Sequence, residues 1–200
     1  MRYSLMLCAG LAASPAMAGI EEALTDHILP GFAGFSTAAD ALAVTAEADC
    51  SPDALRAPWN AAFDAWTEIG DIRMGPSETG ALSVSFWPDA RGFTPKTLRR
   101  LISSEEEVGT DPAAFADVSI AARGLFALEQ MLYDADFDDY APGSYACTLV
   151  QTATADLASQ AQALEAGWRD GYAAVLRSAG AEGNSAFLSE QEAMTALYTQ

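Results

Sequence analysis

Residues 122–133 read ARGLFALEQMLY, a run rich in helix-forming residues. Apolar residues recur there at helical spacing, and the stripe they form consists of Val118, Ala122, Leu125, Leu128 and Leu132. Glu129 falls inside this stripe. Because an isolated carboxylate is costly to bury, we expect Glu129 to have a partner, a bound ligand or a raised pKa. It is the first candidate site residue, either as half of a metal site or as a carboxylate facing a polar crevice.

The rest of the chain is also predicted to be helical, since alanine is abundant and β-branched runs are scarce. Gly-Pro, Trp-Pro and Gly-Phe-Thr-Pro mark residues 75–95 as irregular. The expected helices cover residues 20–48 with a bend near Pro30, a segment through 59–69, and residues 94–104, 111–133, 144–177 and 185–200. The pattern predicts one all-α domain over residues 19–200, an up-and-down helical bundle with a long irregular loop after the second helix.

Residues 1–18 are predicted to be a secretory signal peptide. Arg2 supplies the positive start, residues 3–13 form a short apolar run, and Ala16-Met17-Ala18 is typical of a cleavage site. The apolar run is too short to cross a bilayer, and no later uninterrupted apolar segment reaches about 18 residues. We therefore expect cleavage near Ala18, export to the periplasm or cell envelope, and no integral membrane segment.

Acidic residues strongly outnumber basic ones, with 28 Asp and Glu against 10 Lys and Arg, and the formal net charge is −18 at pH 7. Nucleic acids and anionic membranes need a basic face, so neither is expected as a partner. The acidic surface is typical of a solvated face. The aspartates of residues 134–143 lack the spacing and the terminal glutamate of an EF-hand, and a hydrated loop is expected there.

Cleavage would remove Cys8 and leave Cys50 and Cys147. Two cysteines in an oxidising compartment predict one disulfide, closing a loop of nearly a hundred residues. A metal site built on these two cysteines would lack its other two ligands.

The segment Gly124-Leu125-Phe126-Ala127-Leu128-Glu129 resembles the imelysin family, also called the imelysin peptidase family, which shows Gly-x-His-x-x-Glu inside a helix. Other pieces agree with that family in order: Ile28-Leu29-Pro30-Gly31-Phe32, residues 38–42, 59–66, Gly75-Pro76, Phe86-Trp87-Pro88, Cys147, Asp156-Leu157 and Trp168. The resemblance covers most of residues 19–200. It implies the first bundle of an imelysin-type fold, and a cell-envelope setting linked to iron uptake.

The motif positions Gly124, Phe126 and Glu129 depart from the family pattern at one place. Phe126 stands where the family has histidine, and a phenylalanine ring cannot ligate a metal. The one histidine, His27, does not match the motif position. A zinc hydrolase needs about three protein ligands and an open water position. We therefore assign no catalytic residue, and we expect Gly124 to lie mid-helix and allow close helix approach.

The leading interpretation is an exported imelysin-like binding protein linked to metal (iron) uptake, without peptidase activity. Glu129 is its ligand or metal candidate, and the expected crevice is lined by Gly75, Pro76, Trp87 and Asp64. Iron and zinc are the candidate cofactors, and a metal ion or a small ligand is the candidate partner.

Two alternatives stay open. One is a metallopeptidase of imelysin type that recruits His27 and further carboxylates. The other is a structural or partner-binding helical domain, in which a neighbouring helix satisfies Glu129. The resemblance also implies a second bundle that would begin near Gln200, with the site close to the junction. The chain is therefore expected to be either a shortened form or incomplete at its C-terminus.

Overall fold

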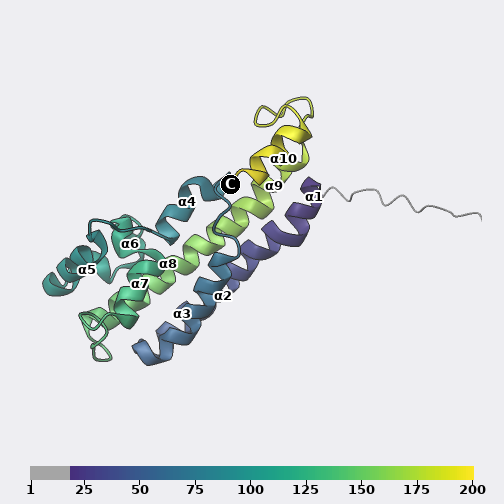
Figure 1. The fold of residues 1–200 in the computed structure, drawn as a ribbon. Helices are drawn as coiled ribbons and strands as arrows, with labels where there is room; N and C mark the ends of the chain where they lie inside the picture. The colour runs from purple at the N-terminus through teal and green to yellow at the C-terminus, as the bar shows by residue number, and fades with distance from the viewer. Residues whose placement is uncertain (1–18) are drawn as a thin grey trace, which may run out of the picture.

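The computed structural model describes residues 19–200, and this part of the chain is all-helical (Figure 1). The predicted signal segment, with Cys8 and the cleavage site, lies outside the described residues. The α-helices are α1 (Ile20–Ala23), α2 (Leu29–Ala48), α3 (Pro52–Thr67), α4 (Pro76–Val84), α5 (Phe93–Ser104), α6 (Pro112–Phe115), α7 (Gly124–Tyr133), α8 (Tyr145–Gly167), α9 (Ala173–Arg177) and α10 (Glu190–Tyr198). Two π-helical turns, η1 (Leu24–Ile28) and η4 (Trp168–Tyr172), and two 3-10 turns, η2 (Glu107–Gly109) and η3 (Ile120–Ala122), join them.

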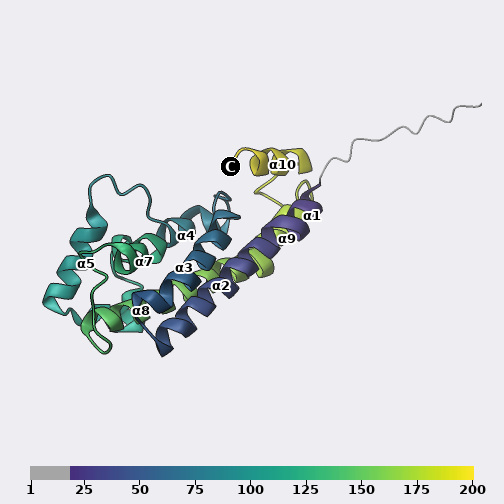
Figure 2. The ribbon, with the colours of Figure 1, turned by 60° about the horizontal axis from the view of Figure 1, so that its bottom comes forward.

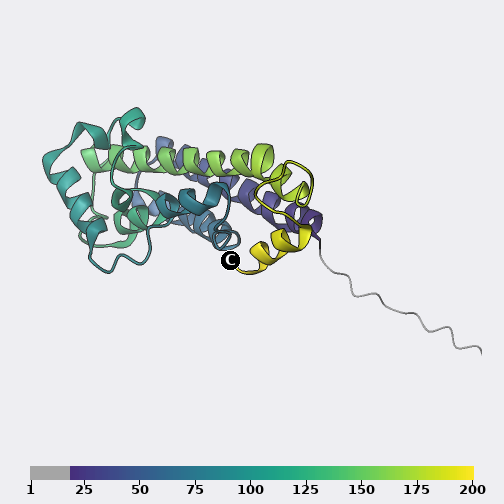
Figure 3. The ribbon, with the colours of Figure 1, turned by 90° about the horizontal axis from the view of Figure 1, so that it is seen from above.

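The long axis of the molecule is built by α2 and α8, which run side by side in opposite directions (Figures 1 and 3). We call α2, α8 and η4 the stem. In its core the rings of Phe32 and Trp168 stack with their centroids 5.4 Å apart, and both side chains are fully buried. The Trp168 Nε1–H donates to Ser77 Oγ of α4 at 3.0 Å, so the buried indole keeps its hydrogen bond.

The predicted disulfide between Cys50 and Cys147 is confirmed. Cys50 lies just after the end of α2, and Cys147 lies in the first turn of α8. The two cysteines are 97 residues apart in the sequence. The Tyr140 hydroxyl donates to the Cys50 carbonyl at 2.9 Å and closes the same corner. In the chain-entropy description, a loop of this length stabilises the folded chain by about 4–5 kcal/mol.

The helix predicted over residues 20–48 is continuous, but it contains the π-helical turn η1 directly before Pro30. Proline has no N–H for a helical hydrogen bond, so a widened turn at this place suits the sequence. By length and composition alone, Ile20–Ala48 could cross a bilayer. Its large side chains Phe32, Phe35 and Leu42 are fully buried in the bundle, which is typical of a core helix in a globular protein.

The irregular loop predicted for residues 75–95 is wrong in its first half, because residues 76–84 form α4. Pro76 occupies the first turn of this helix, where its missing N–H removes no helical bond. Residues 85–92 do lack a helix, and they arch outward between α4 and α5 (Figure 2). Helix α5 then begins at Phe93, one residue before the predicted start at Thr94.

The continuous helix predicted for residues 111–133 is also wrong, since α6, η3 and α7 are three short pieces. Gly124 explains the last break. It has a φ of 74°, and a Cβ there would overlap the carbonyl oxygens of Ser83 and Val84. Gly124 therefore begins α7 instead of lying mid-helix, and its missing side chain lets the end of α4 come close.

The helix predicted for residues 144–177 runs from α8 through η4 into α9. The last helix starts at Glu190 rather than near residue 185, because the Ser189 side chain accepts the Glu192 N–H and caps its start. Helix α10 packs beside α1, at the opposite end of the bundle from α5 and α7 (Figure 2).

Candidate functional site

A hollow of about 220 Å³ lies where α7 faces residues 85–92 and the start of α5. We call this hollow the crevice. It is lined by Phe86, Trp87, Asp89, Gly92, Thr94, Pro95, Phe126, Glu129 and Gln130. The structure thus brings Trp87, predicted from the loop, to the two motif residues Phe126 and Glu129.

Phe126 forms the aromatic wall of the crevice. Its ring stacks on Trp87 with centroids 5.1 Å apart and an interplanar angle of 21°. Its other side meets Phe63 of α3 edge-on, with centroids 6.0 Å apart. Trp87 is 67% exposed, so one face of its indole is open to solvent.

The rings continue away from the crevice as an aromatic row made of Trp87, Phe126, Phe63, Trp59 and Tyr133. Phe63 stacks on Trp59 at 5.2 Å, and Trp59 meets Tyr133 edge-on at 5.5 Å. The Trp59 Nε1–H donates to the Leu125 carbonyl at 3.1 Å. Aromatic pairs of this kind stabilise beyond their buried area, so the row fixes α3 against α7 and holds Phe126 in place.

Glu129 lies one turn after Phe126 on α7 and is half-buried at the crevice wall. The expectation that it is buried among the apolar stripe is corrected here. Leu125, Leu128 and Leu132 are fully buried, whereas Glu129 sits at the edge of their face and opens toward the crevice. None of the ion pairs formed within residues 19–200 involves Glu129. Its carboxylate is therefore available to a ligand.

Asp89, the second carboxylate of the crevice, serves the protein itself. Its Oδ1 accepts the Phe93 N–H at 2.9 Å and its Oδ2 accepts the Thr94 N–H at 2.7 Å, which caps the start of α5. Burial acts to raise the pKa of Asp89, but the hydrogen bonds from Thr94 and Phe93 outweigh it and hold the pKa below the usual value. Asp89 thus stays charged and fixes the loop that carries Trp87.

The start of α7 is held by an almost buried ion pair. Arg123 directs Nε and Nη2 to the two carboxylate oxygens of Asp156 on α8, at 2.9 and 2.7 Å. The side chains are only 12% and 8% exposed. Arg123 Nη1 also donates to the Ala116 carbonyl at 2.6 Å. This two-pronged contact ties α7 to the stem and so positions Phe126 and Glu129.

Gly75, Pro76 and Asp64, which were predicted to line the crevice, are not among the residues that line it. Gly75 lies against the ring of Tyr172, and Pro76 against Gly167, both at the far end of α4 from the crevice. Asp64 is exposed on α3 and is not among the crevice-lining residues. The reason is α4 itself, because a nine-residue helix carries Gly75 and Pro76 well away from Trp87.

Several crevice residues were missed by the reasoning from sequence: Phe86, Asp89, Gly92, Thr94, Pro95 and Gln130. Two signals could have found some of them. Phe86 directly precedes Trp87, and an aspartate four residues before a helix that opens with Thr-Pro is a candidate cap. Gln130 and Gly92 have no sequence signal that we recognise.

The crevice residues do not fit a resident metal ion. The described part of the chain, residues 19–200, has no group of three His, Cys, Asp or Glu side chains that could hold one. In the crevice Asp89 is committed to backbone donors, which leaves Glu129 as the available carboxylate. His27 is exposed on η1, and Cys50 and Cys147 are joined to each other. Zinc sites use about three or four protein ligands.

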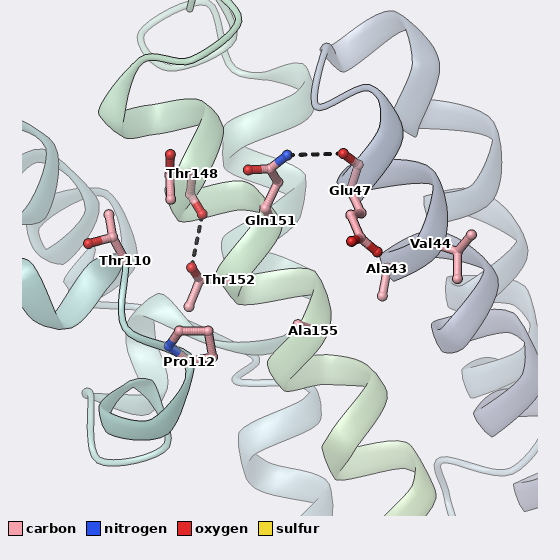
Figure 4. A pocket seen from close by; sticks show the side chains of 9 residues that line it. All are labelled: Ala43, Val44, Glu47, Thr110, Pro112, Thr148, Gln151, Thr152 and Ala155. Atoms are coloured by element: carbon pink, nitrogen blue, oxygen red, sulfur yellow. Dashed lines mark hydrogen bonds between the residues drawn. The ribbon is translucent and has the colours of Figure 1, made fainter.

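A second hollow of about 360 Å³ lies between α2, α8 and the segment before α6 (Figure 4). Two of its polar side chains, Gln151 and Thr152, donate to helix carbonyls. Gln151 Nε2 donates to the Ala46 carbonyl at 3.0 Å, and Thr152 Oγ1 donates to the Thr148 carbonyl at 3.0 Å. This hollow is lined by none of the predicted site residues, whereas Trp87, Phe126 and Glu129 line the crevice, so we place the candidate site at the crevice.

The fold and the site define an all-α bundle protein whose crevice lies beside a helix that starts Gly-x-Phe-x-x-Glu. The chain belongs to the imelysin family, whose family model matches residues 28–200. The crystal structure of an imelysin-like protein from Psychrobacter arcticum is similar, with a TM-score of 0.72 and 22% sequence identity. The likeness covers 90% of this chain and 58% of that one, so this chain spans somewhat more than half of its length. No curated protein sequence matches the chain.

Proposed function

We propose that this chain is an exported binding domain of the cell envelope, linked to metal (iron) uptake and without peptidase activity, with the crevice as its ligand site. The place of Phe126 carries the proposal. Its ring stands where the resemblance to the family implies a histidine, and it packs against Trp87 and Phe63. The helix face beside Glu129 is therefore an aromatic wall, which suits binding and lacks the ligands of a hydrolytic centre.

The cellular setting is supported by two features of different kinds. Residues 1–18 have the pattern of a signal peptide. The Cys50–Cys147 disulfide is typical of proteins in oxidising compartments. The link to iron uptake is what membership of the family implies, and the ion titrations described below test it.

The alternatives find less support in the geometry. A metallopeptidase that recruits His27 would need it near Glu129, but His27 is exposed on η1, next to the α1 that packs against α9 and α10. A purely structural domain would have Glu129 satisfied by a neighbouring helix in a dry core. Glu129 instead lines the crevice.

Two assays on the purified chain test the proposal. A protease assay with zinc supplied should show no chelator-sensitive cleavage, and such cleavage would overturn the non-catalytic part. Isothermal titration with ferrous, ferric and zinc ions should show weak binding, because one carboxylate supplies few of the ligands a metal needs. Glu129→Gln should remove this binding, while Asp64→Asn on exposed α3 should leave it unchanged. No heat with any of the ions, or equal heats in both variants, would remove the metal link.

A further inference from the structure

We propose that the crevice recognises an organic cation through its ammonium or guanidinium group, with the Trp87 and Phe126 rings as the wall and Glu129 as the counter-charge. This inference rests on the proposed function, in that the crevice is taken as the binding site. It adds the chemical class of the ligand.

The first argument comes from the aromatic row, because within residues 19–200 a cation lies against the ring at one of its ends and not at the other. At the far end the Arg56 guanidinium lies over the Tyr133 ring, 5.3 Å from the centroid. Arg56 Nη2 is also paired with the Asp138 carboxylate at 3.1 Å. A ring, a carboxylate and a cation are thus combined at that end.

The crevice end of the row offers a ring and a carboxylate without a cation. The arginine–ring contacts among residues 19–200 involve Tyr133, Trp66 and Phe137, and none of them involves Trp87 or Phe126. The Trp87 indole is largely open to solvent, and Glu129 is on the same crevice wall as Phe126. The missing member of this arrangement is a positive group supplied by a ligand.

Charge makes the second argument. Two carboxylates line the crevice, and its lining, which is drawn wholly from residues 86–130, includes no lysine or arginine. Asp89 is held by the backbone of α5, so Glu129 is the carboxylate that faces a ligand. The chain as a whole has a formal net charge of −18. Such a field raises the local concentration of cations near an acidic hollow.

Size and donor type decide between kinds of cation. A hollow of about 220 Å³ admits a head group and a short stem, and it is smaller than the sites of drug-sized ligands. A bare divalent ion prefers several oxygen ligands, which aromatic rings cannot supply. A tetrahedral ammonium or a planar guanidinium gains from the face of an indole, the best aromatic partner for a cation.

The test locates binding at Trp87. The purified chain, labelled with 5-fluorotryptophan, is titrated with tetramethylammonium chloride or methylguanidinium chloride and followed by 19F NMR. The chain has four tryptophans, and Trp87→Phe assigns the Trp87 signal. We expect a saturable shift at Trp87, while the buried Trp59, Trp66 and Trp168 stay unchanged. Potassium chloride controls for ionic strength, and tert-butanol is a neutral probe of similar shape.

Matched variants test the two contacts by isothermal titration. Glu129→Gln and Trp87→Leu should each weaken binding of tetramethylammonium about tenfold. Asp64→Asn and Tyr198→Leu change an exposed carboxylate and an exposed aromatic ring elsewhere, and they should have no effect. Nα-acetylarginine amide and Nα-acetyllysine amide are titrated in the same way. If they bind more tightly than the small ions, the natural ligand is the side chain of a polypeptide.

Binding of tert-butanol as tight as that of tetramethylammonium would overturn the inference, since the crevice would then be merely apolar. So would the absence of any shift at Trp87. Neither result touches the protease assay or the metal titration, so failure of this inference is distinguishable from failure of the proposed function.

Discussion

Trp168 in the stem and Trp87 at the crevice are both tryptophans, but their surroundings are opposite. Trp168 is fully buried, stacked on Phe32, with its N–H bonded to Ser77. Trp87 is 67% exposed and rests on Phe126. The stem is held by continuous apolar packing, whereas the loop that carries Trp87 is fixed to the start of α5 by the hydrogen bonds of Asp89. The Trp87 ring can therefore stay at the surface, because hydrogen bonds from the backbone of α5 to Asp89 fix the loop that carries it.

The largest expected effect separates the two tryptophans. Trp168→Ala should lower the free energy of unfolding by about 4 kcal/mol, because it removes a buried ring and leaves a cavity. Trp87→Ala should cost less than about 1 kcal/mol, since most of that ring is already in water. Urea unfolding followed by circular dichroism measures both. Similar losses in the two variants would break the comparison and place Trp87 in the core.

A smaller loss of stability is expected when the Arg123–Asp156 ion pair, which joins α7 to α8, is removed. Arg123→Met should lower the free energy of unfolding by about 3 kcal/mol, because it leaves the Asp156 carboxylate buried without its partner. The double variant Arg123→Met, Asp156→Leu should recover most of this loss, since no unpaired charge remains. Hydrogen exchange should show the single variant loosening α7 more than α2. A uniform loosening of both helices would mean that this ion pair does not belong to the crevice end.

The smallest expected effect is at the cap of α5. Asp89→Ala should speed amide exchange of Phe93 and Thr94 about fivefold, because both N–H groups lose their acceptor. The folded-state pKa of Asp89 is lowered, so its contribution is present above the ordinary value of 3.8 and is lost as pH falls through the folded pKa. The difference from Asp89→Asn should therefore shrink in acid. A difference that grows as pH falls would contradict the cap.

Much of the fold could be predicted from the sequence, because a helix with a long apolar face shows a periodic pattern of apolar residues. Trp59, Phe63 and Trp66 recur at helical spacing and predicted α3, which ends at Thr67, two residues before Ile69. The stem helices were predicted on similar local grounds, whereas the disulfide was predicted from the two cysteines that remain after signal cleavage and from the oxidising compartment. The breaks inside residues 111–133 were not predicted, because the sequence does not show that Gly124 has a positive φ and lies against the end of α4.

The candidate site was predicted in part. Glu129, Phe126 and Trp87 were singled out and do meet at the crevice, while Gly75, Pro76 and Asp64 do not. Gly75 and Trp87 are close in the sequence, but helix α4 lies between them and keeps them apart in space. The partner of Arg123 lies 33 residues away on α8 and has no local signal.

Residue types and their spacing were enough to predict a helical bundle, a phenylalanine at position 126 on the helix that carries Glu129, and a pairing of Cys50 with Cys147. These are properties of residue type and spacing, which need no knowledge of neighbours. The tertiary structure alone decided that Glu129 opens to a crevice and that Phe126 packs between Trp87 and Phe63. Burial and ring contacts across α3, α7 and residues 85–92 arise from packing between segments far apart in the chain, and no local pattern records them.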